Sequence, residues 1–300
     1  MYLIIINYKY MQVTFFTCLY NCDKFIESYI NMFDKLLNFD KHKLLITNII
    51  DSNLDETNSK IDYFQNKYIN IKIIRIYKKN DPGLYECWNN MIKIINTELV
   101  CNINPDDILE PNFLDLLTYF NDKNDLVCCP LKIMNEENKI VNIWHNKKQY
   151  FYTIKYNDNY EDKLNNYLYF IKNSNCKFEI KTINTNYFDI FDMFRFSTKL
   201  KSKIGKNDGY RPINLPGCAP IWKKSLFDKY GGFNESEYYE SADYELWCRY
   251  LSKGVKMFCF NKPLVIFRCR NDSVSNNKKN FNIVNKIFDK YHPLKNHNII

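Results

Sequence analysis

The sequence predicts an α/β fold in which a mostly parallel sheet is sandwiched between helices. Short uncharged segments of β-branched and aromatic residues alternate with longer segments of helical periodicity. Strands without charge are typical of parallel sheets covered on both faces, because neither face meets water. A hydrophobic content of 46% over 300 residues indicates a globular chain of one large or two modest domains.

The first half of the chain repeats the strand–helix pattern. An Asp-Pro-Gly break at 81–83 separates the third strand from a helix with Leu84, Trp88, Met91 and Ile95 on one face. A polar loop is expected at 51–57. The predicted strands are 13–17, 44–50, 71–77, 99–103 and 126–130, and the predicted helices are 24–38, 61–68, 84–95 and 112–120.

The second half begins with a segment of weak periodicity, 145–213, which is rich in Asn, Lys, Tyr and Phe and is interpreted as an insertion. A helix that begins at Ser241, a residue suited to the N-cap, turns Leu246, Trp247, Tyr250 and Leu251 inward. The remaining predicted elements are helices at 221–230, 241–252 and 281–291 and strands at 255–260 and 264–267.

Composition limits the environment and the partners. The formal net charge of +8 is spread without a dense basic run, and no nucleic-acid-binding signature is present, so no nucleic-acid partner is expected. The 11 cysteines show no zinc or disulfide spacing, which favours free thiols. No apolar stretch is long enough to span a bilayer. We therefore expect a soluble cytoplasmic protein, with docking on a membrane surface left open, and four histidines on its surface.

Three acidic elements are candidates for chemistry. Asp106-Asp107 follows an uncharged strand, where a divalent cation would compensate two carboxylates; a solvated loop or a helix cap is the alternative. Asp51 ends another strand and could bind a ribose or be an ordinary loop acid. Asp243, in the first turn of a helix, could be a general base or could only complement the helix dipole. Because ligands bind at the carboxyl ends of parallel strands, Asp51 and Asp106-Asp107 are expected to share a pocket.

The order of motifs resembles that of family 2 glycosyltransferases, which have the GT-A fold. The resemblance covers about residues 12–130 and 216–270. It rests on the series VTFFTCLYNCDKFIESYI, LLITNIIDSNLDET, KNDPGLYECWNNMI, ELVCNINPDDILEPNFL, GCAPIWKKSLFDKYGGFNES and ADYELWCRYL. It implies a GT-A domain at 11–270, with 145–213 as a variable acceptor-side insertion, and a C-terminal tail at 271–300.

The resemblance also implies roles for single residues. Asp243 matches the catalytic base, and Asp107 with Asp106 matches the pair that coordinates Mn²⁺ or Mg²⁺. Many relatives have a histidine after the last core strands; this chain has arginines there, which are expected to hold the diphosphate instead. The implied nucleotide-sugar-binding residues are Thr17, Asp51, Asp81, Asp106, Arg268 and Arg270, and the implied acceptor-side residues are Gly217, Trp222 and Trp247.

The predicted reaction is transfer of a sugar from a nucleotide-sugar, with a UDP-sugar as the first choice, to the hydroxyl of a glycan or another acceptor, with inversion at the anomeric carbon. Two alternatives stay open at this stage. A non-catalytic module on the same fold would bind a sugar or nucleotide without transfer. A metal-dependent nucleotidyltransferase would also use clustered carboxylates, but would release pyrophosphate from an NTP.

Overall fold

The structure is a computed structural model. It describes residues 11–50, 55–120, 124–135, 138–144, 187–188, 216–260, 262–268 and 280–291. Within these residues no helix is long and apolar enough to cross a membrane. The Asp51 site, most of the 145–213 insertion and the three histidines other than His42 lie outside the described residues.

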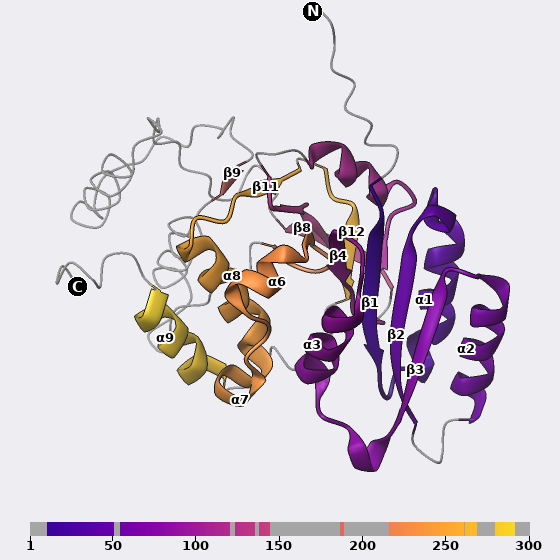
Figure 1. The fold of residues 1–300 in the computed structure, drawn as a ribbon. Helices are drawn as coiled ribbons and strands as arrows, with labels where there is room; N and C mark the ends of the chain where they lie inside the picture. The colour runs from indigo at the N-terminus through magenta and orange to yellow at the C-terminus, as the bar shows by residue number, and fades with distance from the viewer. Residues whose placement is uncertain are drawn as a thin grey trace, which may run out of the picture.

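An eight-stranded sheet forms the centre of the fold, in the order β3-β2-β1-β4-β10-β6-β11-β9 (Figure 1). Strands β10 and β9 run antiparallel to the other strands of the sheet, which are parallel to one another. The mostly parallel sheet that the sequence predicts is therefore confirmed. The strands are β1 (Val13–Leu19), β2 (Lys43–Ile50), β3 (Ile71–Tyr77), β4 (Leu99–Asn102), β6 (Leu126–Cys128), β9 (Tyr187–Phe188), β10 (Ile221–Lys223) and β11 (Met257–Cys259).

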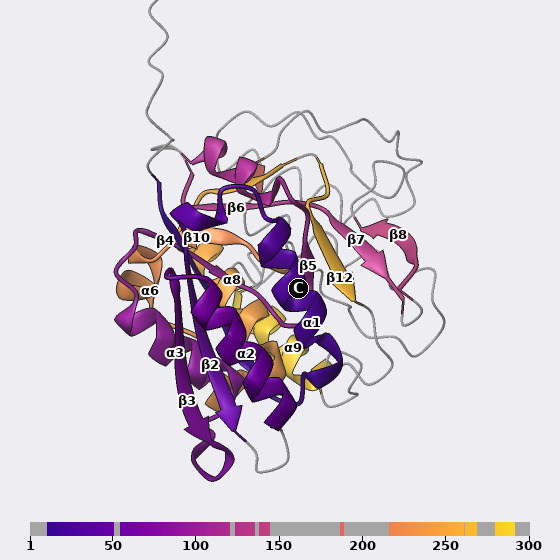
Figure 2. The same cartoon turned by 90° about the vertical axis from the view of Figure 1, so that its right-hand side faces the viewer.

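Helices cover both faces of this sheet because its strands are apolar on both sides. Phe15 of β1 joins a core cluster with α1 (Asp23–Lys35) and α2 (Asp55–Lys67). The next residue, Phe16, joins a second cluster on the opposite face with α3 (Leu84–Ile94), α6 (Ser225–Tyr230) and α8 (Ala242–Ser252). Figure 2 shows α1 and α2 on one side of β2 and β3 and α3 on the other.

A second, four-stranded sheet lies beside the first, in the order β5-β12-β7-β8. Its strands are β5 (Ile108–Leu109), β7 (Leu131–Met134), β8 (Ile140–Trp144) and β12 (Val265–Arg268). Since β5 follows Asp107 directly and pairs with β12, this sheet brings the end of β12 next to the Asp106-Asp107 turn. The sequence predicts strands here without indicating that they form a separate sheet.

The C-terminal helix α9 (Asn280–Tyr291) packs on α8, on α7 (Glu235–Tyr238) and on the 3₁₀ turn at Tyr239–Ser241 (Figure 1). Its Val284 and Ile287 are buried in the same core cluster as α8. The segment that the sequence suggests is a tail therefore contributes a helix to the packed domain.

Several predicted elements differ in detail. Residues 221–223 form strand β10 rather than the start of a helix, since this apolar segment pairs with β4 and β6. The predicted helix at 112–120 is a 3₁₀ helix, Phe113–Tyr119. Leu84, expected on the buried face of α3, is 38% exposed because it is the first residue of the helix. Ser241 occupies the N-cap of α8, but its hydroxyl does not cap the helix.

Candidate active site

Asp106 and Asp107 form a tight turn between β4 and β5. The Asp107 N–H donates to the Asn104 carbonyl at 3.2 Å, and Asn104 Nδ2 donates to Asp107 Oδ2 at 3.3 Å. The two carboxylates differ in exposure: Asp107 is 1% exposed, whereas Asp106 is half-buried. The turn therefore presents one carboxylate to solvent and holds the other beneath it.

The Asp107 carboxyl is poorly compensated in its buried position. Its Oδ1 has no hydrogen-bond partner. Burial, followed by the charge of Asp106, raises the pKa of Asp107 to about 8, against smaller opposing contributions from Cys218, Asn104 and the Arg268 backbone. A buried carboxyl that lacks a compensating charge is energetically costly, so this position fits a cation ligand.

Asp243 lies in the first turn of α8 and is half-buried. Its Oδ1 accepts the backbone N–H of Tyr244 at 2.7 Å. Placement at a helix N-terminus favours the ionised carboxylate through the helix dipole, which is the form that a general base needs.

Cys218 connects the two acidic elements in space, although they are far apart in the sequence. Burial raises the pKa of the Cys218 thiol, and the charges of Asp107, Asp106 and Asp243 raise it further. Carboxylates from the β4–β5 turn and from the first turn of α8 thus lie within electrostatic range of a single thiol. Gly217 precedes Cys218 with a φ of +59°, and a side chain there would contact Leu131, so this approach suits glycine.

Two further carboxylates lie at the beginning of α3. Asp81 Oδ1 accepts the Gly83 N–H at 2.9 Å, and the Gly83 φ of +94° requires glycine. Glu235 caps the helix: its Oε2 accepts the N–H groups of Tyr85 at 3.1 Å and Glu86 at 3.3 Å. The charge of the exposed Asp81 also contributes to the raised pKa of Cys18 in β1, so Asp81 lies within electrostatic range of the first strand.

Arg268, at the end of β12, lies against the acidic turn. Its Nε donates to the Asp106 carbonyl at 3.4 Å, its Nη1 donates to Asn138 Oδ1, and its guanidinium lies 5.3 Å from the ring centroid of Phe25. It is 8% exposed. The described contacts of this guanidinium are therefore with neutral groups, and it supplies positive charge next to Asp106.

Three predicted site residues are buried in the core. Thr17 is wholly buried inside β1, which continues to Leu19. Trp222 and Trp247, predicted on the acceptor side, are 0% and 1% exposed and lie edge to face at 5.8 Å. Each of the three occupies an inward position of its strand or helix, and their roles on the donor and acceptor sides of the site stay predictions.

Asp106, Asp107 and Arg268 lie together, Gly217 precedes the thiol that lies beside Asp107, and Asp243 lies within electrostatic range of that thiol. Asp81 is linked to this region through its electrostatic effect on Cys18 and Glu235. Arg270, like Asp51, lies outside the described residues. Sequence reasoning missed Glu235 and Tyr85, whose contacts link residues about 150 positions apart. Only a glutamate after a turn and a tyrosine at a helix start mark them in the sequence, and neither is a specific signal.

A divalent cation fits the acidic turn, given the unpartnered Asp107 Oδ1. Among the described residues no group of three or more His, Cys, Asp or Glu side chains is arranged to hold a metal ion. A cation held by one or two carboxylates together with substrate phosphates needs no such cluster. Asp107, with Asp106 beside it, would be the protein's contribution.

The family model for "Glycosyl transferase family 2" matches residues 14–197, more than half of the chain. The chain belongs to glycosyl transferase family 2. The match includes the Asp106-Asp107 turn and ends before Asp243. No curated protein matches the sequence of this family 2 member.

Solved structures support the GT-A fold of this family 2 member. TarS 1–349 of S. aureus matches at TM-score 0.54 and 14% identity over 86% of this chain and 60% of that chain. The same protein in complex with UDP-GlcNAc matches at TM-score 0.58 and 12% identity over 96% and 69%. The mannosyltransferase PcManGT from Pyrobaculum calidifontis, in complex with GDP-Man and Mn²⁺, matches at TM-score 0.50 and 11% identity over 93% and 61%. A longer TarS structure is also similar, and this chain spans 41% of its length.

Proposed function

We propose that this protein transfers a sugar from a nucleotide-sugar to an acceptor hydroxyl, with a UDP-sugar as the donor. The observation that carries the proposal is that Asp106, Asp107 and Asp243 all lie within electrostatic range of Cys218 in a member of glycosyl transferase family 2. Similar structures contain UDP-GlcNAc, UDP, or GDP-Man with Mn²⁺, which supports a nucleotide-sugar donor.

In this proposal Asp107, with Asp106, holds Mn²⁺ or Mg²⁺ against the donor diphosphate. The bound cation would supply positive charge to the leaving diphosphate. Arg268 adds a fixed positive charge beside Asp106, and Asp81 lies on the donor side. Residues 145–213 are proposed to select the acceptor.

Asp243 is the proposed general base. It accepts the proton of the acceptor hydroxyl while that oxygen attacks the anomeric carbon from the face opposite the diphosphate. The anomeric carbon passes through an oxocarbenium-like state, and a single displacement inverts its configuration. An α-linked donor would then give a β-linked product without a covalent enzyme intermediate.

The first experiment is a screen of UDP-, GDP- and dTDP-sugars with Mn²⁺, scored by nucleotide release and by thermal protection. A UDP-sugar should give both signals. Asp243→Asn should retain donor protection and lose nearly all transfer, whereas Asp107→Asn should lose metal-dependent protection. Normal transfer by Asp243→Asn would refute the base assignment, and pyrophosphate release from an NTP would point to nucleotidyl transfer instead.

A further inference from the structure

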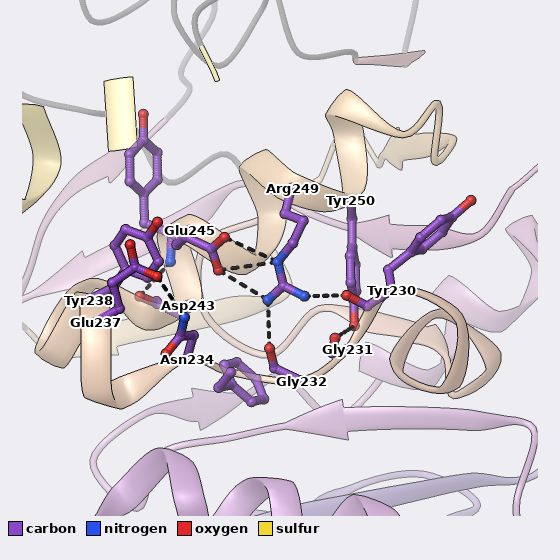
Figure 3. Close-up of polar contacts among 12 residues, drawn as sticks. Tyr230, Gly231, Gly232, Asn234, Glu237, Tyr238, Asp243, Glu245, Arg249 and Tyr250 are labelled. Carbon is purple, nitrogen blue, oxygen red and sulfur yellow. Dashed lines mark hydrogen bonds and ion pairs between the residues drawn. The ribbon is translucent and has the colours of Figure 1, made fainter. Parts of the chain in front are cut away.

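The segment 230–235 lies between the helix that carries Asp243 and the helix that begins beside Asp81. On one side, side chains of α8 bind three consecutive carbonyls of this segment (Figure 3). Arg249 Nη1 donates to the Tyr230 carbonyl, and its Nη2 donates to the Gly232 carbonyl at 2.5 Å. The Tyr250 hydroxyl donates to the Gly231 carbonyl at 2.9 Å. One guanidinium and one phenol thus fix the segment to α8.

The Arg249 guanidinium is itself held by a buried carboxylate of the same helix. Its Nε and Nη2 donate to Glu245 Oε1 and Oε2 at 3.1 and 3.0 Å (Figure 3). Glu245 is 1% exposed and also accepts a hydrogen bond from the Tyr291 hydroxyl of α9. Because removing one partner of a buried pair leaves an uncompensated charge, this arrangement strongly constrains the Arg249 side chain.

The other side of the segment is fastened to α3. Asn89 accepts the Phe233 N–H through Oδ1 at 2.9 Å and donates to the Phe233 carbonyl through Nδ2 at 2.8 Å. The Phe233 ring stacks on Tyr85 at 5.3 Å. A Cβ at Gly232 would lie 2.2 Å from Asn89 Oδ1, so the segment approaches α3 too closely for any side chain at that position.

Along the chain, Asp243 lies between Glu240, whose carbonyl is bonded to α3, and Arg249, which is bonded to the 230–235 segment. The Tyr85 hydroxyl donates to the Glu240 carbonyl at 3.1 Å, just before α8 begins, and the charge of Asp243 contributes to the raised pKa of Tyr85. Since Glu245 is two residues after Asp243, a shift of α8 along the 230–235 segment would move the carboxylate of Asp243 relative to α3.

We propose that the 230–235 segment fixes the position of Asp243 relative to the donor side of the site, with Arg249 and Asn89 as positioning residues. This rests on the proposed function, in which Asp243 is the base. Arginine suits the task because its planar fork reaches two carbonyls and a carboxylate together, whereas a lysine ammonium has one compact head.

The test compares Arg249→Lys with the wild type and with Lys253→Ala, which removes an exposed cation just after the same helix. Arg249→Lys retains a positive charge for Glu245, so the protein should fold. We expect kcat to fall about tenfold or more, as misplaced catalytic groups do. The Kd for the nucleotide-sugar with Mn²⁺ should stay within about twofold, since the donor-side residues are unchanged. If Arg249 only stabilised the fold, Arg249→Lys would not lower kcat while leaving the affinity for the donor unchanged.

Hydrogen exchange supplies a readout that needs no activity. Amides of 242–246 should exchange faster in Arg249→Lys than in the wild type, whereas those of β1 and β4 should be unchanged. Unchanged exchange at 242–246, or an unchanged kcat, would overturn the proposal. If the wild type transfers no sugar, the proposed function fails, and hydrogen exchange alone decides whether the segment fixes α8. Should Arg249→Lys fail to fold, Tyr250→Phe, which loses only the bond to Gly231, takes its place under the same criteria.

Discussion

His42 Nδ1 accepts the backbone N–H of Val13 at 3.1 Å, which joins the residue before β2 to the first residue of β1. The expectation that the histidines lie on the surface is wrong for His42, which is 5% exposed. Burial lowers the pKa of His42 to about 4 from its usual 6.5. The neutral imidazole therefore forms a buried contact between the beginnings of β1 and β2.

This burial predicts a dependence of stability on pH. The unfolded chain binds a proton at His42 below about pH 6.5, and the folded chain does so only near pH 4, so stability is complete above 6.5 and falls as the pH approaches 4. His42→Asn keeps an acceptor for Val13 without titrating. Urea denaturation at pH 7.5 and 4.5 should show the wild type losing about 2 kcal/mol more than the variant. Parallel losses in the two proteins would contradict the prediction.

Asp107→Asn should stabilise the metal-free protein. The raised pKa means that the folded state disfavours the carboxylate, so wild-type stability falls as the pH rises from about 4 through 8. In EDTA the variant should melt about 2 °C or more above the wild type at pH 9, and the gap should narrow at pH 6.

The control for Asp107→Asn is Asp115→Asn, which changes an exposed acid of the 3₁₀ helix and should show no such gap. Added Mn²⁺ with UDP should stabilise the wild type and the control and leave Asp107→Asn unaffected. A variant that melts below the wild type at pH 9 would show that the Asp107 carboxylate stabilises the fold without metal.

Trp222→Phe separates a core role from an acceptor-side role. Trp222 Nε1 donates to Asn102 Oδ1 at 3.2 Å in a fully buried setting, so the variant leaves a cavity and an unpaired amide oxygen. The free energy of unfolding should fall by about 2 kcal/mol, whereas KM for the acceptor should stay within about twofold. A large rise in KM for the acceptor at unchanged stability would support the acceptor-side assignment.

Gly232→Ala and Gly254→Ala test steric fit against backbone strain. A Cβ at Gly232 would lie 2.2 Å from Asn89 Oδ1 and 2.4 Å from Phe227 Cε2, whereas one at Gly254 would meet nothing within 4 Å, although its φ is +81°. Gly254→Ala should cost about 1 kcal/mol from strain. Gly232→Ala should cost more, about 2 kcal/mol or above, from overpacking. Denaturant titration measures both, and equal losses would contradict the close approach.

Arg268→Gln tests the charge beside the acidic turn. Loss of the guanidinium should weaken UDP binding in the presence of Mn²⁺ about tenfold, because a charged hydrogen-bond donor near a diphosphate contributes about 1.5–3 kcal/mol. Lys132→Gln, in the neighbouring strand β7 and paired with Glu110, is the matched control and should bind UDP as the wild type does. Calorimetric titration of UDP measures both, and equal affinity of wild type and Arg268→Gln would exclude Arg268 from diphosphate binding.

Much of the fold could be predicted because its strands are recognisable locally. The β-branched residues of β3, which alternate with polar ones, predict that strand with its observed bounds, 71–77. The 221–223 segment was misassigned because an apolar run that short fits a strand or a helix equally well, and only its pairing with β4 and β6 decides. The same holds for Trp222 and Trp247: the sequence shows that they are large and apolar, and the packing shows which way they face.

The sequence by itself determined the α/β class, the family resemblance and the acidic candidates, since these depend on periodicity and on residues that are neighbours in the chain. Tertiary structure alone decided that Asp107 is buried beneath Asp106, that Cys218 lies within range of acids from both halves of the chain, and that Glu235 caps α3. The contacts of Cys218 with Asp107 and of Glu235 with Tyr85 join positions separated by more than a hundred residues, and no local pattern of residue types encodes the loop closures that bring them together.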